Sequence, residues 1–252
     1  MQDAPLHDAI ARAPRGGRAF WLKAADGLRL RIGHWPGPAA PRGTVFLLPG
    51  RTEYVEKYGP TAAAFAARGY GLLAIDWRGQ GLADRLLDDP LKGHVGRFSD
   101  YQLDLAAVEQ AVAGETVSHL LITHTHIDHS PGAAPLKEKV GGLIVGCAPL
   151  TLADDGPRAD AAFDPDYAPD RVLRHGEAVS GPGWTLEAVH TPDHTSNHLC
   201  FAFPEEETLF SGDHVMGWST TVVAPPDGDM AAYLQSLELL QRRPDRLCLP
   251  TH

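Results

Sequence analysis

The sequence predicts an α/β protein built from two parts, and three observations lead to this prediction. The first part, up to about residue 112, alternates strand-like apolar runs with a helix-like run. The second part contains short strand-like runs, several of which end at a histidine or an aspartate. Histidine is unevenly distributed, because only three of the 13 precede residue 114. We therefore expect two segments, 1–112 and 113–252, with different chemistry.

In the first segment, apolar runs separated by turn residues predict each element. The runs "AFWLKA" and "LRLRIGHW" predict a hairpin. The runs "GTVFLLPG" and "YGLLAIDW" predict buried strands, linked by a helix at "YGPTAAAFAARG". A second helix is predicted from "FSDYQLDLAAVEQAV". The expected elements are hairpin strands 19–24 and 28–35, strand 43–50, helix 58–69, strand 70–77 and helix 98–112.

In the second segment, the strand-like runs are short and bounded by glycine, proline or polar residues. The run "VSHLLIT" predicts a buried strand, and "AAPLKEKV" after Ser130-Pro131-Gly132 predicts a helix with Pro135 near its start. The expected strands are 117–123, 184–189, 208–213 and 247–250. We expect the three cysteines, which form no CxxC pair, to be core residues.

The sequence "HTHIDH", residues 124 to 129, places three histidines and one aspartate in six positions. A hydrophobic core has no use for such a group, because each buried polar side chain without a partner costs about 1 to 3 kcal/mol. A metal ion satisfies several of them at once. The motif follows a predicted strand and precedes a predicted helix, which places it on a turn held by a rigid scaffold.

Composition limits the classes of partner. The formal net charge of −10 argues against a surface that binds nucleic acid. Apolar runs are too short to cross a bilayer, and the N-terminus lacks the apolar core of a signal peptide, so we expect a cytoplasmic protein without a membrane partner. The sequence leaves the oligomeric state open.

The first segment resembles the N-terminal part of an α/β-hydrolase of the lysophospholipase or monoglyceride-lipase type. The likeness lies in "VFLLPGRTEYVEKYGPTAAAFAARGYGLLAIDWRGQGLADR", where Pro49-Gly50 matches the oxyanion-hole turn and Asp76 to Arg85 matches the D-x-R-G-x-G segment. The G-x-S-x-G nucleophile elbow of that family is absent from the chain. We therefore interpret this segment as a scaffold without serine catalysis.

The second segment resembles the metallo-β-lactamase superfamily, on the side of the glyoxalase II-like and β-lactamase-like 2 hydrolases. The matching motifs are "VSHLLITHTHIDHSPGAA", "LEAVHTPDHTSNHLCFAF", "TLFSGDHVMGW" and "LCLPTH", in the order of the family. The resemblance implies a partial αββα sandwich joined to a partial α/β-hydrolase βαβ segment. It also implies a binuclear centre, most simply of two Zn²⁺ ions, with manganese and iron as alternatives.

By this resemblance each ligand has a role. His124, His126 and His194 would hold the first metal, Asp128, His129 and His252 the second, and Asp213 would bridge them. A shared hydroxide, oriented by the catalytic Asp128, would attack the carbonyl of a small-molecule ester, thioester, lactone or amide. We expect His190, His198 and His214 to support these ligands rather than to bind metal.

Two other functions stay open at this point. The first is a non-catalytic chimera of two hydrolase fragments, because the strands that usually precede the metal motif in this superfamily are missing and the second segment looks truncated. A half-sandwich of this kind would leave one face of its sheet uncovered by the second segment. The second is a metal-dependent nuclease, which the acidic composition disfavours.

Overall fold

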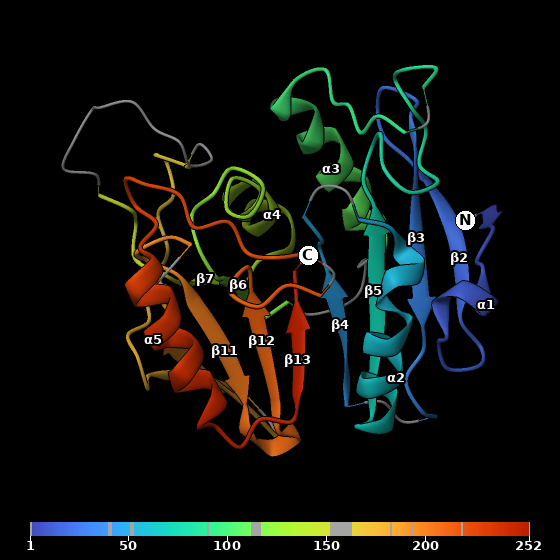
Figure 1. The fold of residues 1–252 in the computed structure, drawn as a ribbon. Helices are drawn as coiled ribbons and strands as arrows, with labels where there is room; N and C mark the ends of the chain where they lie inside the picture. The colour runs from blue at the N-terminus through green and yellow to red at the C-terminus, as the bar shows by residue number, and fades with distance from the viewer. Residues whose placement is uncertain are drawn as a thin grey trace. The chain divides into compact units, whose positions relative to one another are not determined.

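The computed structural model describes residues 2–39, 42–50, 53–89, 91–111, 117–151, 163–181, 183–192, 194–217 and 219–251. The chain forms two compact units, residues 1–115 and 116–252. Each unit has its own β-structure, as Figure 1 shows, and the α/β class is confirmed. Among the described residues, no helix is both long enough and apolar enough to cross a membrane.

The first unit contains one five-stranded sheet with the order β1-β2-β3-β5-β4. The hairpin of β2 and β3 is confirmed, and β4 and β5 are parallel strands connected through α2. The elements are β1 (Gln2–Ala4), α1 (Asp8–Ala11), β2 (Arg18–Lys23), β3 (Arg29–Trp35), β4 (Gly43–Leu47), η1 (Val55–Tyr58), α2 (Gly59–Ala67), β5 (Tyr70–Asp76), η2 (Phe98–Asp100) and α3 (Tyr101–Ala111).

Burial along the two parallel strands differs, and one expectation was wrong. Every residue of β5 is buried, as predicted, because β5 lies between β3 and β4. The other strand, β4, was expected to be buried but is mostly half-buried. It forms the edge of the sheet, so only one of its sides pairs with a neighbour.

Two buried ion-pair networks hold the D-x-R-G-x-G segment of the first unit. Arg31 is fully buried and contacts Asp76 at 2.7 Å and Glu56 at 2.6 Å. Arg78 contacts the buried Asp104 of α3 at 2.8 Å. Losing one partner of such a pair leaves an uncompensated charge in the core. The polar residues Asp76 and Arg78 of this segment therefore have a structural role.

The second unit contains a five-stranded sheet of order β13-β12-β11-β10-β9 and a three-stranded sheet of order β6-β7-β8. The larger sheet is antiparallel except for the parallel pair β12 and β13. The elements are β6 (His119–Ile122), α4 (Ala133–Val140), β7 (Leu143–Gly146), β8 (Arg171–Val172), β9 (Ala178–Gly181), β10 (Trp184–His190), β11 (Leu199–Phe203), η3 (Pro204–Glu206), β12 (Thr208–Gly212), α5 (Met230–Gln241) and β13 (Leu247–Pro250).

The larger sheet of the second unit is covered on both faces by its own unit, so the expectation of an uncovered face was wrong. One core cluster joins Ile122 and Val145 of the small sheet to Phe201 of the large one. A second cluster packs Leu239 and Leu240 of α5 against the other face, at residues of β10, β11 and β12. Figure 1 shows α5 beside β11. The sequence did not reveal the small sheet because β7 and β8 follow the metal motif instead of preceding it.

The cysteines divide between the core and the surface. Cys147 and Cys200 are buried, as predicted. Cys248 is exposed, contrary to prediction, since it lies on β13 at the edge of the larger sheet.

Candidate metal centre

The turn after β6 brings three histidines of the HTHIDH motif together. The amides of His129 and Ser130 both donate to the carbonyl of His126, at 3.0 and 3.2 Å, and this folds the chain back on itself. The ring centroids of His124 and His129 are then 4.1 Å apart. The turn ends where α4 begins at Ala133, so the predicted strand, turn and helix are confirmed.

Two further site residues follow strands of the larger sheet. His194 lies in the loop between β10 and β11, where the Thr191 amide donates to the His198 carbonyl at 3.1 Å. Asp213 directly follows β12, after Gly212 with a φ of +53°. Both positions agree with the expectation that strand ends deliver the polar side chains of the site.

The first group of ligand-type atoms consists of three buried imidazoles. Nε2 of His124 is 3.1 Å from Nδ1 of His126, and Nε2 of His194 is 2.8 Å from the same atom. The outward nitrogens have separate partners, because Nδ1 of His124 lies 3.0 Å from Thr123 Oγ1 and Nδ1 of His194 lies 2.6 Å from the Val222 carbonyl. Three ring nitrogens therefore converge on one point.

The second group consists of His124, His129 and Asp213. Oδ2 of Asp213 lies 3.4 Å from Nε2 of His129, 3.9 Å from Nε2 of His124 and 3.7 Å from Nε2 of His194. One carboxylate oxygen thus faces histidines of both groups. Asp128 is more peripheral, with Oδ2 at 3.7 Å from Nε2 of His129 and a side chain that is 25% exposed.

Asp213 is held from three directions. Its amide donates to Nε2 of His198 at 3.2 Å, and its carbonyl accepts a hydrogen bond from Thr221 Oγ1. Its second carboxylate oxygen, Oδ1, accepts a hydrogen bond from the hydroxyl of Thr251. These contacts leave Oδ2 directed at the histidines. No sequence pattern points to Thr221, and Thr251 could have been suspected only as the neighbour of His252.

The pKa values of the histidines follow from burial and from Asp213. Burial, together with the neighbouring His129, lowers the pKa of His124 well below its ordinary value. Burial and the adjacent His194 lower the pKa of His126 to about 4. Burial also acts to lower the pKa of His129, but the Asp213 carboxylate outweighs it and the pKa is raised. Neutral imidazole is the form that binds a metal, and two of the three rings favour it.

The other predicted residues lie as follows. His252, expected as a ligand of the second metal, lies outside the described residues. His190 is exposed at the end of β10, with Nε2 at 3.0 Å from the Ser196 carbonyl. His198 and His214 are fully buried, and their ring centroids are 6.2 Å apart.

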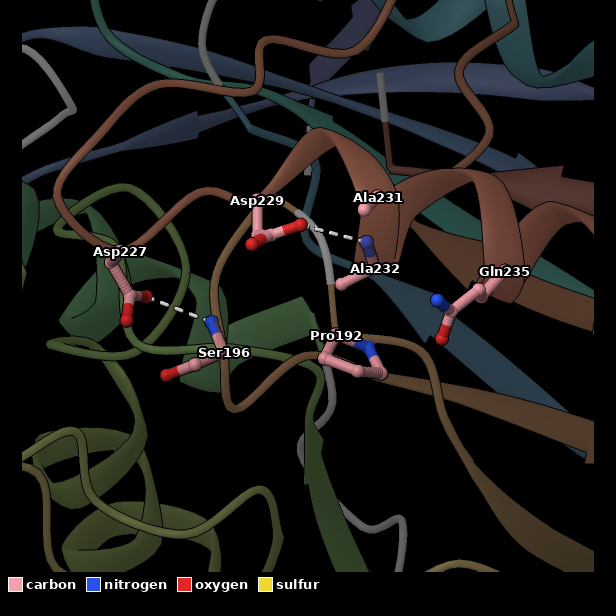
Figure 2. Close-up of a pocket in the computed structure, with 7 residues that line it drawn as sticks. All are labelled: Pro192, Ser196, Asp227, Asp229, Ala231, Ala232 and Gln235. Atoms are coloured by element: carbon pink, nitrogen blue, oxygen red, sulfur yellow. Dashed lines mark hydrogen bonds between the residues drawn. The ribbon is translucent and has the colours of Figure 1, made fainter.

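A pocket of about 320 Å³ lies beside the His194 loop (Figure 2). The Asp227 carboxylate accepts a hydrogen bond from the Ser196 amide at 2.8 Å, and Asp229 caps α5 by accepting from the Ala232 amide at 2.8 Å. The hydroxyl of Ser236 donates to the Pro192 carbonyl at 3.1 Å. Asp227 and Ser236 therefore fasten the His194 loop to the segment before α5 and to α5 itself.

Strand ends of both sheets thus bring together histidines and an aspartate that could hold metal ions, and the comparison with protein families agrees with a metal-binding fold. Residues 95–252 match the model of the metallo-beta-lactamase superfamily. The chain belongs to this superfamily. Residues 39–134 match the model described as serine aminopeptidase, S33, in agreement with the α/β-hydrolase likeness of the first unit.

The matches with individual relatives cover only part of each relative's length. An atrochrysone carboxyl ACP thioesterase of Aspergillus fumigatus is 33% identical over 170 residues, which is 68% of this chain and 47% of the relative. A hydroxyacylglutathione hydrolase of Rhizobium meliloti is 32% identical over 132 residues, 52% of this chain and 46% of the relative. The chain thus spans about half the length of these relatives.

Among solved structures, a metallo-beta-lactamase from Pontibacter korlensis aligns with a TM-score of 0.48 at 11% identity. This alignment covers 99% of this chain and 89% of the other.

Proposed function

We propose that the protein is a metal-dependent hydrolase that cleaves the bond between the carbonyl carbon and the leaving group of a small acyl substrate, with a thioester as the favoured class. The superfamily and its hydrolase relatives support the class of enzyme. Two relatives whose names denote a thioesterase and a hydroxyacylglutathione hydrolase favour the thioester. Esters, lactones and amides contain the same electrophilic carbonyl and are the alternative substrates.

The observation that supports the proposal most strongly is the convergence of two ligand groups on Asp213. The ligand-type atoms within each group lie within 4.8 Å of one another. Buried imidazole nitrogens that face each other at 2.8 and 3.1 Å cannot all present lone pairs without repulsion, so the cluster fits a cation at its centre. The residues present are therefore suited to a metal.

The donor set favours zinc. It consists of imidazole nitrogens and carboxylate oxygens, without a thiolate among the two groups. Imidazole suits zinc, and iron or manganese would use the same donors less selectively. We propose two ions, the first held by His124, His126 and His194, and the second by Asp128, His129 and His252, with Asp213 shared.

Bound metal would supply a water of lowered pKa and would polarise the substrate carbonyl. The residues of this chain then have separate tasks. Asp213 fixes the spacing between the two groups, because its Oδ2 faces both. Asp128, with its partly exposed carboxylate beside His129, orients the attacking water. The imidazoles of His124 and His126 are kept neutral by burial and so remain ligands.

The proposed function is tested by the turnover of matched substrates. The purified protein, loaded with zinc, is offered an acyl thioester, an aryl ester and an aryl phosphodiester, each with a chromogenic readout. We expect thioester hydrolysis that a chelator abolishes and zinc restores. Turnover of the phosphodiester alone would support the nuclease, and the absence of both turnover and bound metal in folded protein would support a non-catalytic chimera.

A further inference from the structure

His198, which the sequence predicts to support the ligands without binding metal, lies next to the cluster. It precedes β11, and its side chain is fully buried. Its Nε2 accepts a hydrogen bond from the Asp213 amide at 3.2 Å, and its Nδ1 lies 2.8 Å from Thr191 Oγ1. Its ring centroid is 5.3 Å from that of His124. The residue therefore touches parts of both ligand groups.

The partners of His198 determine its tautomer. A backbone amide only donates, so Nε2 must carry a lone pair, and the proton resides on Nδ1. Nδ1 then donates to Thr191 Oγ1, whose own hydrogen is free to point to Cys200 Sγ at 3.4 Å. Cys200 Sγ in turn lies 3.5 Å from the Ser211 carbonyl. A series of contacts therefore runs from the Asp213 amide through His198, Thr191 and Cys200 back to the Ser211 carbonyl.

Gly212 makes the approach of His198 possible. A Cβ atom at this position would lie 2.6 Å from His198 Nε2 and 3.1 Å from the Cβ of Thr123. The φ of +53° is also one that glycine adopts without strain. The backbone of residues 211–213 is thus shaped to receive the imidazole.

The same segment supports the other group of ligands. The amide of Leu199 donates to the Thr123 carbonyl at 2.8 Å, and Thr123 Oγ1 lies 3.0 Å from Nδ1 of His124. A change in the position of residues 198–199 therefore acts on Asp213 through the ring and on His124 through the backbone.

We infer that His198 is a positioning residue, whose unprotonated Nε2 holds the Asp213 backbone so that the carboxylate meets the second metal ion. The inference rests on the proposed function, because it requires Asp213 to be a ligand. If the His198 side chain only filled space in the core, its volume would matter and the hydrogen bonds of its two nitrogens would not. Partners that orient a metal ligand commonly change metal affinity by about 10- to 100-fold.

Two amide variants separate the nitrogens of His198. H198Q places an amide oxygen near the position of Nε2 and keeps an acceptor for the Asp213 amide. H198N places its amide near Nδ1, within reach of Thr191 but not of Asp213. T191V removes the group that accepts from Nδ1 and leaves the imidazole free to adopt the other tautomer.

The experiment titrates Co²⁺ into metal-free protein and follows the visible absorption of the bound ions, with circular dichroism as a check on folding. We expect two binding steps in the parent, with the second step weakened about 10- to 100-fold in H198N. H198Q should stay within about threefold of the parent, and T191V should weaken the second step in the same direction as H198N. If H198N does not fold, the affinity of T191V for the second Co²⁺ ion tests the inference instead.

The outcomes distinguish the inference from the function on which it rests. The inference would be overturned, while the proposed function stands, if H198N bound the second Co²⁺ ion as tightly as the parent does. If H198N does not fold, the same result for T191V would overturn it. Equal losses in H198N and H198Q would also overturn it, because only the ring would then matter. Failure of the folded parent to bind cobalt would overturn the proposed function and the inference together.

Discussion

The Nε2 atom of His129 lies 3.4 Å from the Oδ2 atom of Asp213, although one residue belongs to the turn after β6 and the other follows β12. The Asp213 carboxylate raises the pKa of His129 against the opposing effect of burial. A cation between the two residues would replace the proton that this pKa favours. The contact joins the small sheet to the large one.

We expect the purified protein to contain close to two zinc ions per chain. Elemental analysis after dialysis against metal-free buffer measures this content directly. Removing the metal with a chelator should lower the melting temperature, because a ligand present at 1,000 times its dissociation constant stabilises the folded state by about 4 kcal/mol. Metal content near zero in protein with intact secondary structure would contradict the prediction.

Replacing Asp128 should lower the rate of substrate turnover more than it lowers binding of the first metal ion. Its carboxylate is partly exposed and lies near His129, whereas His126 stands between His124 and His194. We expect Asp128→Ala to retain about one zinc and to lose two orders of magnitude or more in thioester turnover. His126→Ala should lose metal as well.

The control for this pair is Asp166→Ala, which removes a carboxylate from an exposed residue outside both ligand groups. It should match the parent in metal content and in turnover. The assigned roles would be wrong if Asp128→Ala kept full metal and the parent rate.

The first unit should not react with serine-directed fluorophosphonate probes. The chain has no G-x-S-x-G elbow, and the carbonyl of Pro49 in the oxyanion-type turn accepts a hydrogen bond from Trp77 Nε1 at 2.7 Å. Mass spectrometry of the intact protein after incubation with the probe measures labelling. Stoichiometric addition at one serine would refute the interpretation of this unit as a scaffold.

Glu56→Gln should destabilise the protein by about 3 kcal/mol at neutral pH, because the buried Arg31 loses one of its two carboxylate partners and keeps only Asp76. Burial acts to raise the pKa of Glu56, but hydrogen bonding and attraction to Arg31 outweigh it and hold the pKa below its usual range. A lowered pKa contributes stability that is complete above the ordinary value and is lost as the pH falls through the folded value.

The difference between parent and Glu56→Gln should therefore be largest at pH 7 and should shrink below about pH 4.3. Urea unfolding at several pH values, followed by circular dichroism, measures it. Glu238→Gln is the matched control, since Glu238 pairs with Arg242 on the surface and such pairs contribute less than about 1 kcal/mol. If the difference in unfolding free energy between parent and Glu56→Gln grew as the pH fell, the predicted direction of the pH dependence would be wrong.

The sequence was sufficient for the parts of the site that depend on local order. The HTHIDH residues share one turn, so their proximity follows from spacing alone, and His194 and Asp213 could be predicted because strands end beside them. The inward nitrogen of each ring could not be predicted. It depends on distant groups such as the Val222 carbonyl, which fixes Nδ1 of His194.

The fold was predictable to a similar degree. The parallel pair β4 and β5 and the hairpin β2 and β3 follow from apolar periodicity. The edge position of β4 does not, since pairing partners are a property of the whole sheet. The cover on the larger sheet of the second unit depends in part on β7 and α5, and no single motif predicts how they pack.

The ligand groups draw on both sheets of the second unit, and this has a consequence for the unfolded chain. Roughly ninety residues separate His124 from Asp213, so an ion bound by both would close a long loop in the polymer. A covalent cross-link over such a length restricts the denatured ensemble by about 4 to 5 kcal/mol. Loss of the ion would then lower the stability of the folded state as well as remove the reaction, and the metal-free protein should be cleaved by proteases faster than the metal-bound protein.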